Sequence, residues 1–210
     1  VSSHQFDTPE RGFTFSVDAP LDMRMSQEGR TAADILNEST EGELRRIFLM
    51  GGVERARAIK LAPEIVTSRP MSTTKEFSEL CVRVSRKWSR DRAKNDLRSQ
   101  HPATVPFQAL RMAVNHELDS IREFLNATPD LVASGGRVAV ISFHSMEDQE
   151  VTRTMRSWGT EVRAPKSLGG GVVKPRLGEL LTKKAIEPTA EETSSNPRSR
   201  SAKLRIFQFD

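Results

Sequence analysis

The run Ser142-Phe-His144-Ser145-Met-Glu-Asp148 brings serine, histidine and carboxylate side chains close together in the chain. These are the nucleophile, base and acid types of a hydrolase. A catalytic triad, however, takes its members from separate strand ends, and the chain lacks a Gly-x-Ser-x-Gly turn. The pattern therefore disfavours a hydrolase. His144 directly follows an apolar run, which suits either a structural histidine or a histidine beside a ligand at a strand end.

A compact charged loop is expected at residues 18–25, because Pro20 and the aspartates around it favour a shaped turn over a helix. Its charged side chains are Asp18, Asp22 and Arg24. They could hold one another in an internal ion pair, or together hold a ribose and a phosphate. The sequence leaves both alternatives open.

Positive charge is gathered in three parts of the chain. The sequence has 32 Lys and Arg against 28 Asp and Glu, a net charge of +4 and a pI near 9.5. The clusters are Arg83, Arg86, Lys87, Arg90, Arg92, Lys94 and Arg98; the stretch from Arg153 to Lys184; and Arg198, Arg200, Lys203 and Arg205. Such clusters are typical of a polyanion partner such as RNA, or of a solvated basic surface. The absence of tyrosine and the 6% aromatic content do not favour a base-stacking platform.

Composition limits the kind of protein. With 210 residues, 36% of them apolar, the chain is long enough for one large domain or a domain carrying an insertion. It has no run of about 18 apolar residues and no charged-then-apolar leader, so we expect neither a transmembrane helix nor a signal peptide. The single cysteine, Cys81, excludes an internal disulfide and an all-cysteine zinc site, and it suggests a reducing compartment. We expect a cytoplasmic protein or an organellar homologue, with no metal site.

Helices are expected as far as about residue 128. Thr40 with Glu43 and Thr73 with Glu76 have the spacing of capping boxes, each just ahead of an apolar stripe. The stripe behind the second box comprises Phe77, Leu80, Cys81, Val84 and Trp88. This helical spacing makes Cys81 a core residue rather than a nucleophile.

The His101-Pro102 dipeptide is expected to break the helical region. The apolar spacing over Phe107–Pro129 then predicts one long helix. On that helix Arg111 and Asn115 lie four residues apart, where they can bond each other or reach a common ligand.

The second half of the chain has an α/β pattern. The apolar run Arg137–Phe143 follows a glycine turn and is typical of a strand buried on both faces of a parallel sheet. Ser145–Asp148 then predicts the capped, acidic start of a helix that runs to about Trp158.

The remaining residues are expected to be loop-rich before a final strand. Gly169-Gly170-Gly171 is interpreted as a flexible linker rather than a phosphate cradle, because no strand precedes it. The last strand is expected over Ser201–Phe209, with Leu204 and Ile206 on one face.

Eight short motifs occur together and in order along the chain. They are Glu10-Arg-Gly-Phe-Thr-Phe15, Asp18-Ala-Pro-Leu-Asp-Met-Arg-Met25, Thr31-Ala-Ala-Asp-Ile-Leu-Asn37, His101-Pro-Ala-Thr104, Phe107-Gln-Ala-Leu-Arg111, Val114-Asn115, Ile141-Ser-Phe-His-Ser145 and Asn196-Pro-Arg-Ser-Arg-Ser201. In this combination the chain resembles the MraW family of methyltransferases over essentially its whole length. The resemblance implies methyl transfer from S-adenosylmethionine to N4 of a cytidine, 1402 in the usual numbering, in the decoding region of 16S ribosomal RNA. It implies small-subunit ribosomal RNA or the 30S subunit as partner, with no membrane, and leaves a homodimer open.

The family's fold is an α/β, class I (Rossmann-like) methyltransferase core interrupted by a mostly helical substrate-recognition insertion. On this plan residues 1–28 and 101–210 belong to the core, and residues 29–100 form an inserted helical RNA-recognition domain. The core is expected to be incomplete, because the family's glycine-rich first turn and the acidic residue after its second strand lie upstream of the element that is Val1-Ser2-Ser3 here. We therefore treat the chain as the C-terminal portion of a longer protein. Two hydrophobic clusters are expected, one around Phe77, Leu80 and Val84 and one around Val138, Val140 and Ile206.

The resemblance also implies the site residues. Cytosine N4 is a poor nucleophile because its lone pair is delocalised, so an enzyme must orient it and accept a proton or hydrogen bond from it. The catalytic candidates are Ser2, Ser3, Asp22 and His144, and Gln5 is the candidate cofactor contact. The RNA-binding candidates are Arg24, Arg86, Lys87, Arg90, Arg198 and Arg200.

The sequence departs from the family's pattern at a few positions. His4, Ala19 and Ser26 stand where proline, glycine and aspartate are usual, and Gly51-Gly-Val-Glu54 replaces a Tyr-Gly-Glu-Glu segment. Ala19 matters if its backbone needs a positive φ. With the cofactor site incomplete, the alternative is a non-catalytic or truncated RNA-binding homologue. We expect the 210 residues alone to bind S-adenosylmethionine weakly or not at all.

Overall fold

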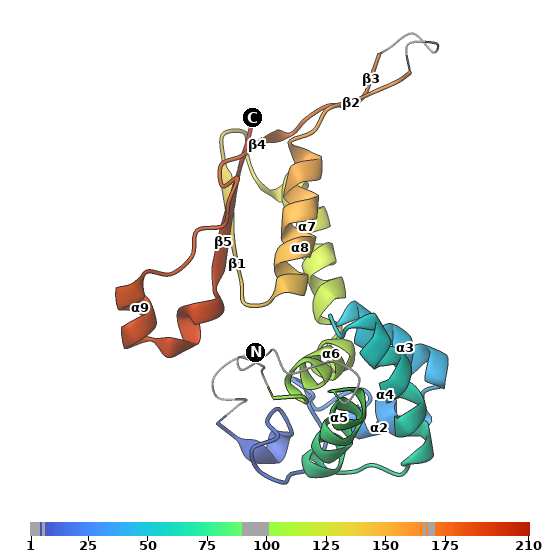
Figure 1. Cartoon of the computed structure of the whole chain (residues 1–210). Helices are drawn as coiled ribbons and strands as arrows, with labels where there is room; N and C mark the ends of the chain where they lie inside the picture. The colour runs from blue at the N-terminus through green and yellow to red at the C-terminus, as the bar shows by residue number, and fades with distance from the viewer. Residues whose placement is uncertain (1–4, 6, 90–100, 166, 168–170) are drawn as a thin grey trace. The chain divides into compact units, whose positions relative to one another are not determined.

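The computed structural model describes residues 5, 7–89, 101–165, 167 and 171–210, with only the backbone of residues 87–89. The chain divides into two compact units, unit 1 (Val1–Glu117) and unit 2 (Leu118–Asp210). Helices make up most of unit 1, whereas unit 2 combines helices with strands (Figure 1). The chain is therefore an α/β protein in the broad sense that was predicted. In the described part of the chain, no helix combines the length and apolar character needed to cross a membrane.

Unit 1 is built around one core of aromatic and aliphatic side chains. Its elements are the short 3-10 helix η1 (Pro9–Arg11) and the helices α2 (Ala32–Glu38), α3 (Glu41–Met50), α4 (Arg55–Thr67), α5 (Thr74–Ser89) and α6 (Thr104–Val114). Phe77 on α5 stacks between Phe48 and Phe107, at centroid distances of 6.2 and 5.1 Å. Leu80 and Val84 belong to the same core, so the first predicted cluster is confirmed.

The predicted helix starts are confirmed as well. Thr40 and Glu43 form a reciprocal capping box at the start of α3. Thr73 and Glu76 exchange the same pair of hydrogen bonds ahead of α5, at 3.0 and 3.3 Å. Cys81 is fully buried on α5, and burial raises the pKa of its thiol to about 12. The thiol therefore stays protonated and acts as a core group, as its position in the stripe predicts.

The core of unit 1 includes side chains from both sides of the predicted boundaries after residues 28 and 100. Leu21 from the loop at residues 18–25 and Leu110 from α6 pack in the same cluster as Phe77. The division of the chain into residues 1–28, 29–100 and 101–210 stays a prediction of the family plan.

The predicted long helix over Phe107–Pro129 is wrong, because it is two helices, α6 and α7 (Glu117–Leu131). The break follows Asn115, whose backbone N–H and side-chain Nδ2 both donate to the Arg111 carbonyl, at 3.1 and 2.9 Å. His116 then adopts a positive φ of 51°, a conformation that cannot continue a right-handed helix.

Unit 2 packs a small antiparallel sheet against α8 and α7. Its further elements are β1 (Arg137–Ser142), α8 (Ser145–Trp158), β2 (Val162–Arg163), β3 (Val172–Lys174), β4 (Gly178–Leu180), α9 (Ala190–Ser195), η3 (Pro197–Ser201) and β5 (Lys203–Phe209). The sheet order is β1-β5-β4, and β2 pairs with β3 in a separate hairpin. Most of the predicted glycine linker lies outside the described residues.

The prediction of a parallel strand buried on both faces is wrong for β1. It pairs antiparallel with β5, with Arg137 opposite Gln208 and Ser142 opposite Lys203. Its side chains alternate, so that Val138 is buried whereas Ile141 is 59% exposed. Helices cover only one face of the strand in unit 2, and an antiparallel sheet tolerates one solvated face.

The second core cluster is confirmed for Val138 and Val140 but not for Ile206. Successive side chains of β5 point to opposite faces, and Phe207 and Phe209 are the residues directed at α8. Both rings contact Trp158, at centroid distances of 5.2 and 5.4 Å. Ile206 therefore lies on the outer face of the sheet, on the same side as Leu204.

Candidate functional site

The loop at residues 18–25 is folded around an ion pair between Asp22 and Arg24. The guanidinium Nε and a terminal nitrogen donate to the two carboxylate oxygens, both at 2.8 Å. The Arg24 backbone N–H also donates to the Asp22 carboxylate at 3.0 Å. Of the two alternatives that the sequence left open, the internal ion pair is the one found.

The same pair controls the charge of Asp22. The hydrogen bond from Arg24 holds the pKa of the Asp22 carboxyl below its usual range, against a smaller opposing effect of burial. Arg24 further donates to the carbonyls of Gln27 and Gly29, at 2.7 and 3.3 Å. Asp22 is thus kept ionised, with both oxygens already accepting hydrogen bonds. A role of Asp22 in catalysis or of Arg24 in RNA binding stays a prediction.

Asn115 at the end of α6 ties the loop to the helices. Its Oδ1 accepts from the Met25 backbone N–H at 2.7 Å, and its Nδ2 donates to the Met23 carbonyl at 2.8 Å. On the other side, Arg11 donates to the carbonyls of Arg24 and Met25, at 2.9 and 3.0 Å. These contacts stabilise Met23 in a left-handed conformation with φ 63° and full burial. The loop is therefore pre-organised rather than flexible.

The substitution of the family's glycine by Ala19 leaves this loop intact. Among the described residues, only Met23 and His116 are non-glycine residues with positive φ. Ala19 is instead held by Thr74, whose hydroxyl accepts from the Ala19 backbone N–H at 3.1 Å. The alanine methyl consequently causes no backbone strain.

His144 is the N-cap of α8, a position that the sequence assigned to Ser145. Its backbone is extended, and its Nδ1 accepts from the Glu147 backbone N–H at 3.4 Å. In turn, the Glu147 carboxylate accepts hydrogen bonds from the backbone N–H groups of Phe143 and His144, at 2.8 and 3.3 Å. The predicted helix start at Ser145 is confirmed, but the N-cap is His144, because glutamate lies three positions after it and completes a capping box there.

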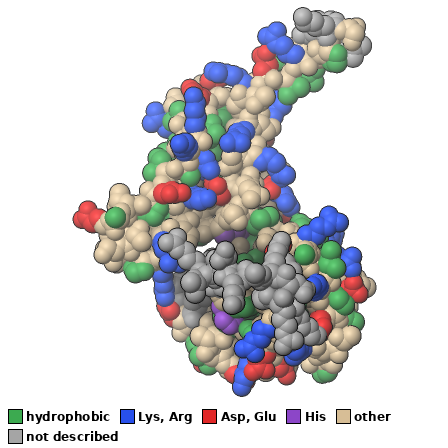
Figure 2. All heavy atoms as spheres, viewed as in Figure 1, with side chains coloured by type: hydrophobic (Ala, Val, Ile, Leu, Met, Phe, Trp, Pro, Cys, Tyr) green, Lys and Arg blue, Asp and Glu red, His purple; other side chains and the backbone are tan. Residues whose placement is uncertain are grey.

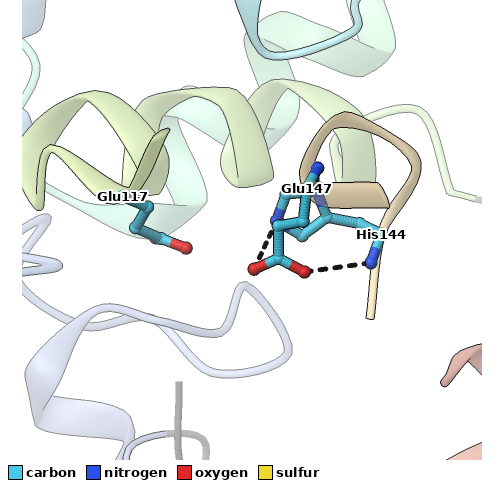
Figure 3. A group of neighbouring side chains, drawn as sticks. All are labelled: Glu117, His144 and Glu147. Carbon is cyan, nitrogen blue, oxygen red and sulfur yellow. Dashed lines mark hydrogen bonds and ion pairs between the residues drawn. The ribbon is translucent and has the colours of Figure 1, made fainter. Parts of the chain in front are cut away.

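The imidazole of His144 and the carboxylate of Glu147 also face each other directly (Figure 3). Nε2 of His144 lies 3.2 Å from a Glu147 oxygen. Burial alone would raise the pKa of Glu147, but hydrogen bonds from His144 and from the Phe143 backbone lower it overall. Glu117, also drawn in Figure 3, is paired with Arg111 at 2.7 and 2.8 Å. His144 thus has a structural role at the strand end, and its proposed catalytic role stays a prediction.

The remaining candidates are only partly described. Ser2, Ser3, Arg90 and the side chain of Lys87 lie outside the described residues, and Gln5 is half-buried in a helical turn. Arg86 is exposed on α5. Arg198 and Arg200 are exposed on η3, where the buried Ser199 between them anchors the turn through a 2.8 Å bond to the Asn196 carbonyl. Figure 2 shows Lys and Arg side chains spread over the visible surface of both units.

Two residues of unit 1 were not singled out from the sequence. Arg57 donates to the Pro102 carbonyl, and the exposed ring of His101 stacks on Phe15 with a centroid distance of 4.8 Å. In the sequence His101 was interpreted as a helix break and as the first residue of the motif His101–Thr104, and Arg57 only as part of a helix. Their proximity arises from a contact across 45 residues that no local pattern contains.

The similarity to known proteins extends over essentially the whole chain. Ribosomal RNA small subunit methyltransferase H of Cyanothece sp. is 45% identical over 209 residues, which are 99% of this chain and 62% of that relative. The proteins of the same name from Gloeothece citriformis and Citrifermentans bemidjiense are 44 and 47% identical, again over 99% of this chain and over 62 and 66% of the relatives. The chain thus spans a little under two thirds of the length of these relatives. The family model described as MraW methylase family matches residues 1–210, which include the loop and the helix ends described above. The chain belongs to the MraW methylase family.

Proposed function

We propose that the protein is an S-adenosylmethionine-dependent methyltransferase that modifies N4 of a cytidine in the decoding region of small-subunit ribosomal RNA. The observation that carries this proposal is the match of all 210 residues to one methylase family, together with relatives that are named ribosomal RNA small subunit methyltransferases. The basic residues that remain exposed, among them Arg86 and Arg200, fit an RNA substrate.

The architecture supports a class I core that extends beyond the strands described. Among the described residues β1 lies at the edge of its sheet and pairs only with β5. Its outer face exposes Ile141, and Phe143 just beyond the strand is 55% exposed. An exposed apolar face is usually covered in a native protein, and an unpaired strand edge is usually protected or paired. We propose that the sheet continues past β1 in the enzyme, with an inserted helical RNA-recognition domain between the two parts of the core.

These residues account for only part of a binding site for the cofactor. Gln5 is the one contact that we propose, and the sequence has no glycine-rich first turn or ribose carboxylate in the family's positions. We propose that these 210 residues hold only part of the cofactor site. S-adenosylmethionine would supply an electrophilic methyl group, and the chain's own part is to position the cytosine and accept a hydrogen bond from N4.

The structure supports a positioning role for the loop at residues 18–25. Its backbone is fixed by Asn115 and Arg11, so the loop can meet a substrate without first paying the entropy of ordering. Ser2 and Ser3 are the proposed acceptors for the N4 proton or hydrogen bond, with Asp22 and His144 as further candidates. Arg24, Arg86, Lys87, Arg90, Arg198 and Arg200 are the proposed RNA contacts.

In vitro methyl transfer tests the proposal. Small-subunit ribosomal RNA is incubated with methyl-labelled S-adenosylmethionine and either the 210-residue chain or a chain as long as the relatives. We expect label in cytosine N4 with the longer chain, and neither transfer nor micromolar cofactor binding with the 210 residues. RNA binding by both chains without transfer by either would instead support a non-catalytic RNA-binding homologue.

A further inference from the structure

The His101 ring is an exposed aromatic surface held in a fixed orientation. Its Nδ1 accepts from the Ala103 backbone N–H at 3.2 Å, so the ring cannot turn freely. One face stacks on Phe15 with an interplanar angle of 25°. Phe15 in turn meets Phe107 edge to face at 4.9 Å, and through it the core of unit 1. The stack therefore begins in the core and ends at the surface with an aromatic ring.

A half-buried arginine, Arg57, contacts the residue that follows His101. Arg57 donates to the Pro102 carbonyl, one residue from His101, and its Nε is buried without a hydrogen-bond partner in the described part of the chain. Burial lowers the pKa of Arg57, although a guanidinium remains charged at any physiological pH. Besides burial, the groups that act electrostatically on Arg57 are Cys81 and Glu54. A partly desolvated cation of this kind favours an anionic ligand.

We propose that His101, Phe15 and Arg57 form a subsite for one nucleotide of single-stranded RNA. The base extends the stack on the outer face of His101, and the phosphate binds the Arg57 guanidinium. Only an unpaired base can present its face to the ring, so the subsite selects single-stranded RNA over a duplex. The inference rests on the proposed function and names a substrate contact for it. It also revises the expectation, based on the low aromatic content, that the chain has no stacking platform.

The ring and its hydrogen bond can be separated by two substitutions. His101→Asn removes the ring but keeps an acceptor for the backbone N–H two residues on, as asparagine does in turns. His101→Phe keeps the ring and removes the acceptor. Binding is measured by fluorescence anisotropy with two labelled probes, a short oligocytidylate and an abasic oligonucleotide of the same length. We expect H101N to weaken binding of oligocytidylate about fivefold or more and H101F to bind it like the original chain.

The abasic probe and a variant of Arg57 test whether the phosphate binds at Arg57. On the abasic probe H101N and the original chain should bind equally, because no base is present to stack. Arg57→Gln should weaken binding of both probes and reduce the slope of the logarithmic salt dependence by about 0.7. Arg55→Gln, an exposed arginine on the same helix, is the matched control and should change binding less than R57Q.

Several results would overturn the subsite. Unchanged oligocytidylate binding by H101N, an equal loss on the abasic probe, or H101F binding as weakly as H101N would each do so. If H101N weakened the binding of S-adenosylmethionine but not of RNA, the ring would be assigned to the cofactor. That result would also contradict the proposal. If the original chain binds neither probe, the RNA-binding part of the proposed function fails together with the subsite, which distinguishes that outcome from failure of the subsite alone.

Discussion

Asp22 and Arg24 stabilise the loop at residues 18–25 only while both are charged. Arg24 lowers the pKa of Asp22 relative to its ordinary value of 3.8. A carboxyl whose pKa is lower in the folded than in the unfolded state adds stability above the unfolded pKa, and this stability is lost as the pH falls through the folded pKa. The ion pair should therefore contribute at neutral pH and cease to contribute well below 3.8.

Asp22→Asn tests this dependence. We expect the substitution to lower the melting temperature at pH 7 and to have a much smaller effect well below pH 3.8, where Asp22 itself is protonated. Thermal unfolding followed by circular dichroism at both pH values is the measurement. Asp18→Asn in the same loop is a control, since no ion pair joins Asp18 to Arg24 among the described contacts. A melting difference between D22N and the original chain that does not change with pH would show that the ion pair is not its cause.

The cap formed by His144 allows its structural and chemical roles to be separated. His144→Asn keeps a good N-cap, whereas His144→Ala removes it, so we expect H144A to be less stable by about 1 kcal/mol and H144N to be close to the original. If His144 also acts in methyl transfer, H144N in the longer protein loses activity at normal stability. Chemical denaturation measures the stability of the two variants, and methyl-transfer rates measure their activity. Normal activity in H144N would restrict His144 to its structural role.

Residue types in the sequence could reveal only part of the candidate site. The charged loop was found because its three charges lie within one short segment, and the internal ion pair was one of two stated alternatives. Arg57 and His101 were missed as site candidates because Arg57 on α4 contacts the carbonyl of Pro102, next to His101, in a turn 45 residues away in sequence. Tertiary contacts of single side chains leave no periodic pattern, and spacing cannot show them.

At the scale of elements, local chemistry predicted helix starts better than helix ends. The boxes at Thr40 and Thr73 were recognisable because both partners lie within four consecutive residues. The break after Asn115 was not, because a histidine with positive φ has no strong sequence signature. The antiparallel direction of β1 also escaped prediction, since a short apolar run does not specify which partner it pairs with.

Two glycines with positive φ provide a matched test of how η1 meets the loop. Gly12 has φ 74°, and an added methyl there would lie 2.4 Å from the Pro20 carbonyl oxygen and 2.8 Å from the Asp22 nitrogen. Gly29 has φ 83° with no atom within 4 Å of such a methyl. We expect Gly29→Ala to cost about 1–2 kcal/mol from backbone strain alone, and Gly12→Ala to cost clearly more. Equal losses in urea unfolding would mean that the close approach of η1 to the loop does not matter for stability.

At the scale of the whole molecule, the described residues form two hydrophobic cores and a sheet whose outer face is exposed at Ile141. Phe77 and Val138 belong to different clusters, as the sequence predicted from two groups of apolar residues. The outer face of the sheet shows Ile141 to solvent, although its own sequence predicted a fully buried strand. An apolar run fits burial on both faces if further parts of the enzyme cover this outer face, and we propose that they do.

A charge on that face should act differently in the short and the long protein. Ile141→Lys should reduce self-association of the 210-residue chain, because it places a charge on an exposed apolar face. In a protein as long as the relatives the same substitution should lower stability, since the lysine would be buried there. Light scattering and thermal unfolding are the measurements. Unchanged stability of I141K in the longer protein would argue that the outer face of β1 stays exposed there.

The central claim is that this protein methylates small-subunit ribosomal RNA, and mass analysis of that RNA tests it most directly. Small-subunit ribosomal RNA is purified from cells with the gene, without it, and with a plasmid copy restored, and its nucleosides are measured. The account predicts that N4-methylcytidine is present with the gene, is lost without it and returns with the plasmid. The same level of N4-methylcytidine in cells without the gene would contradict the assignment.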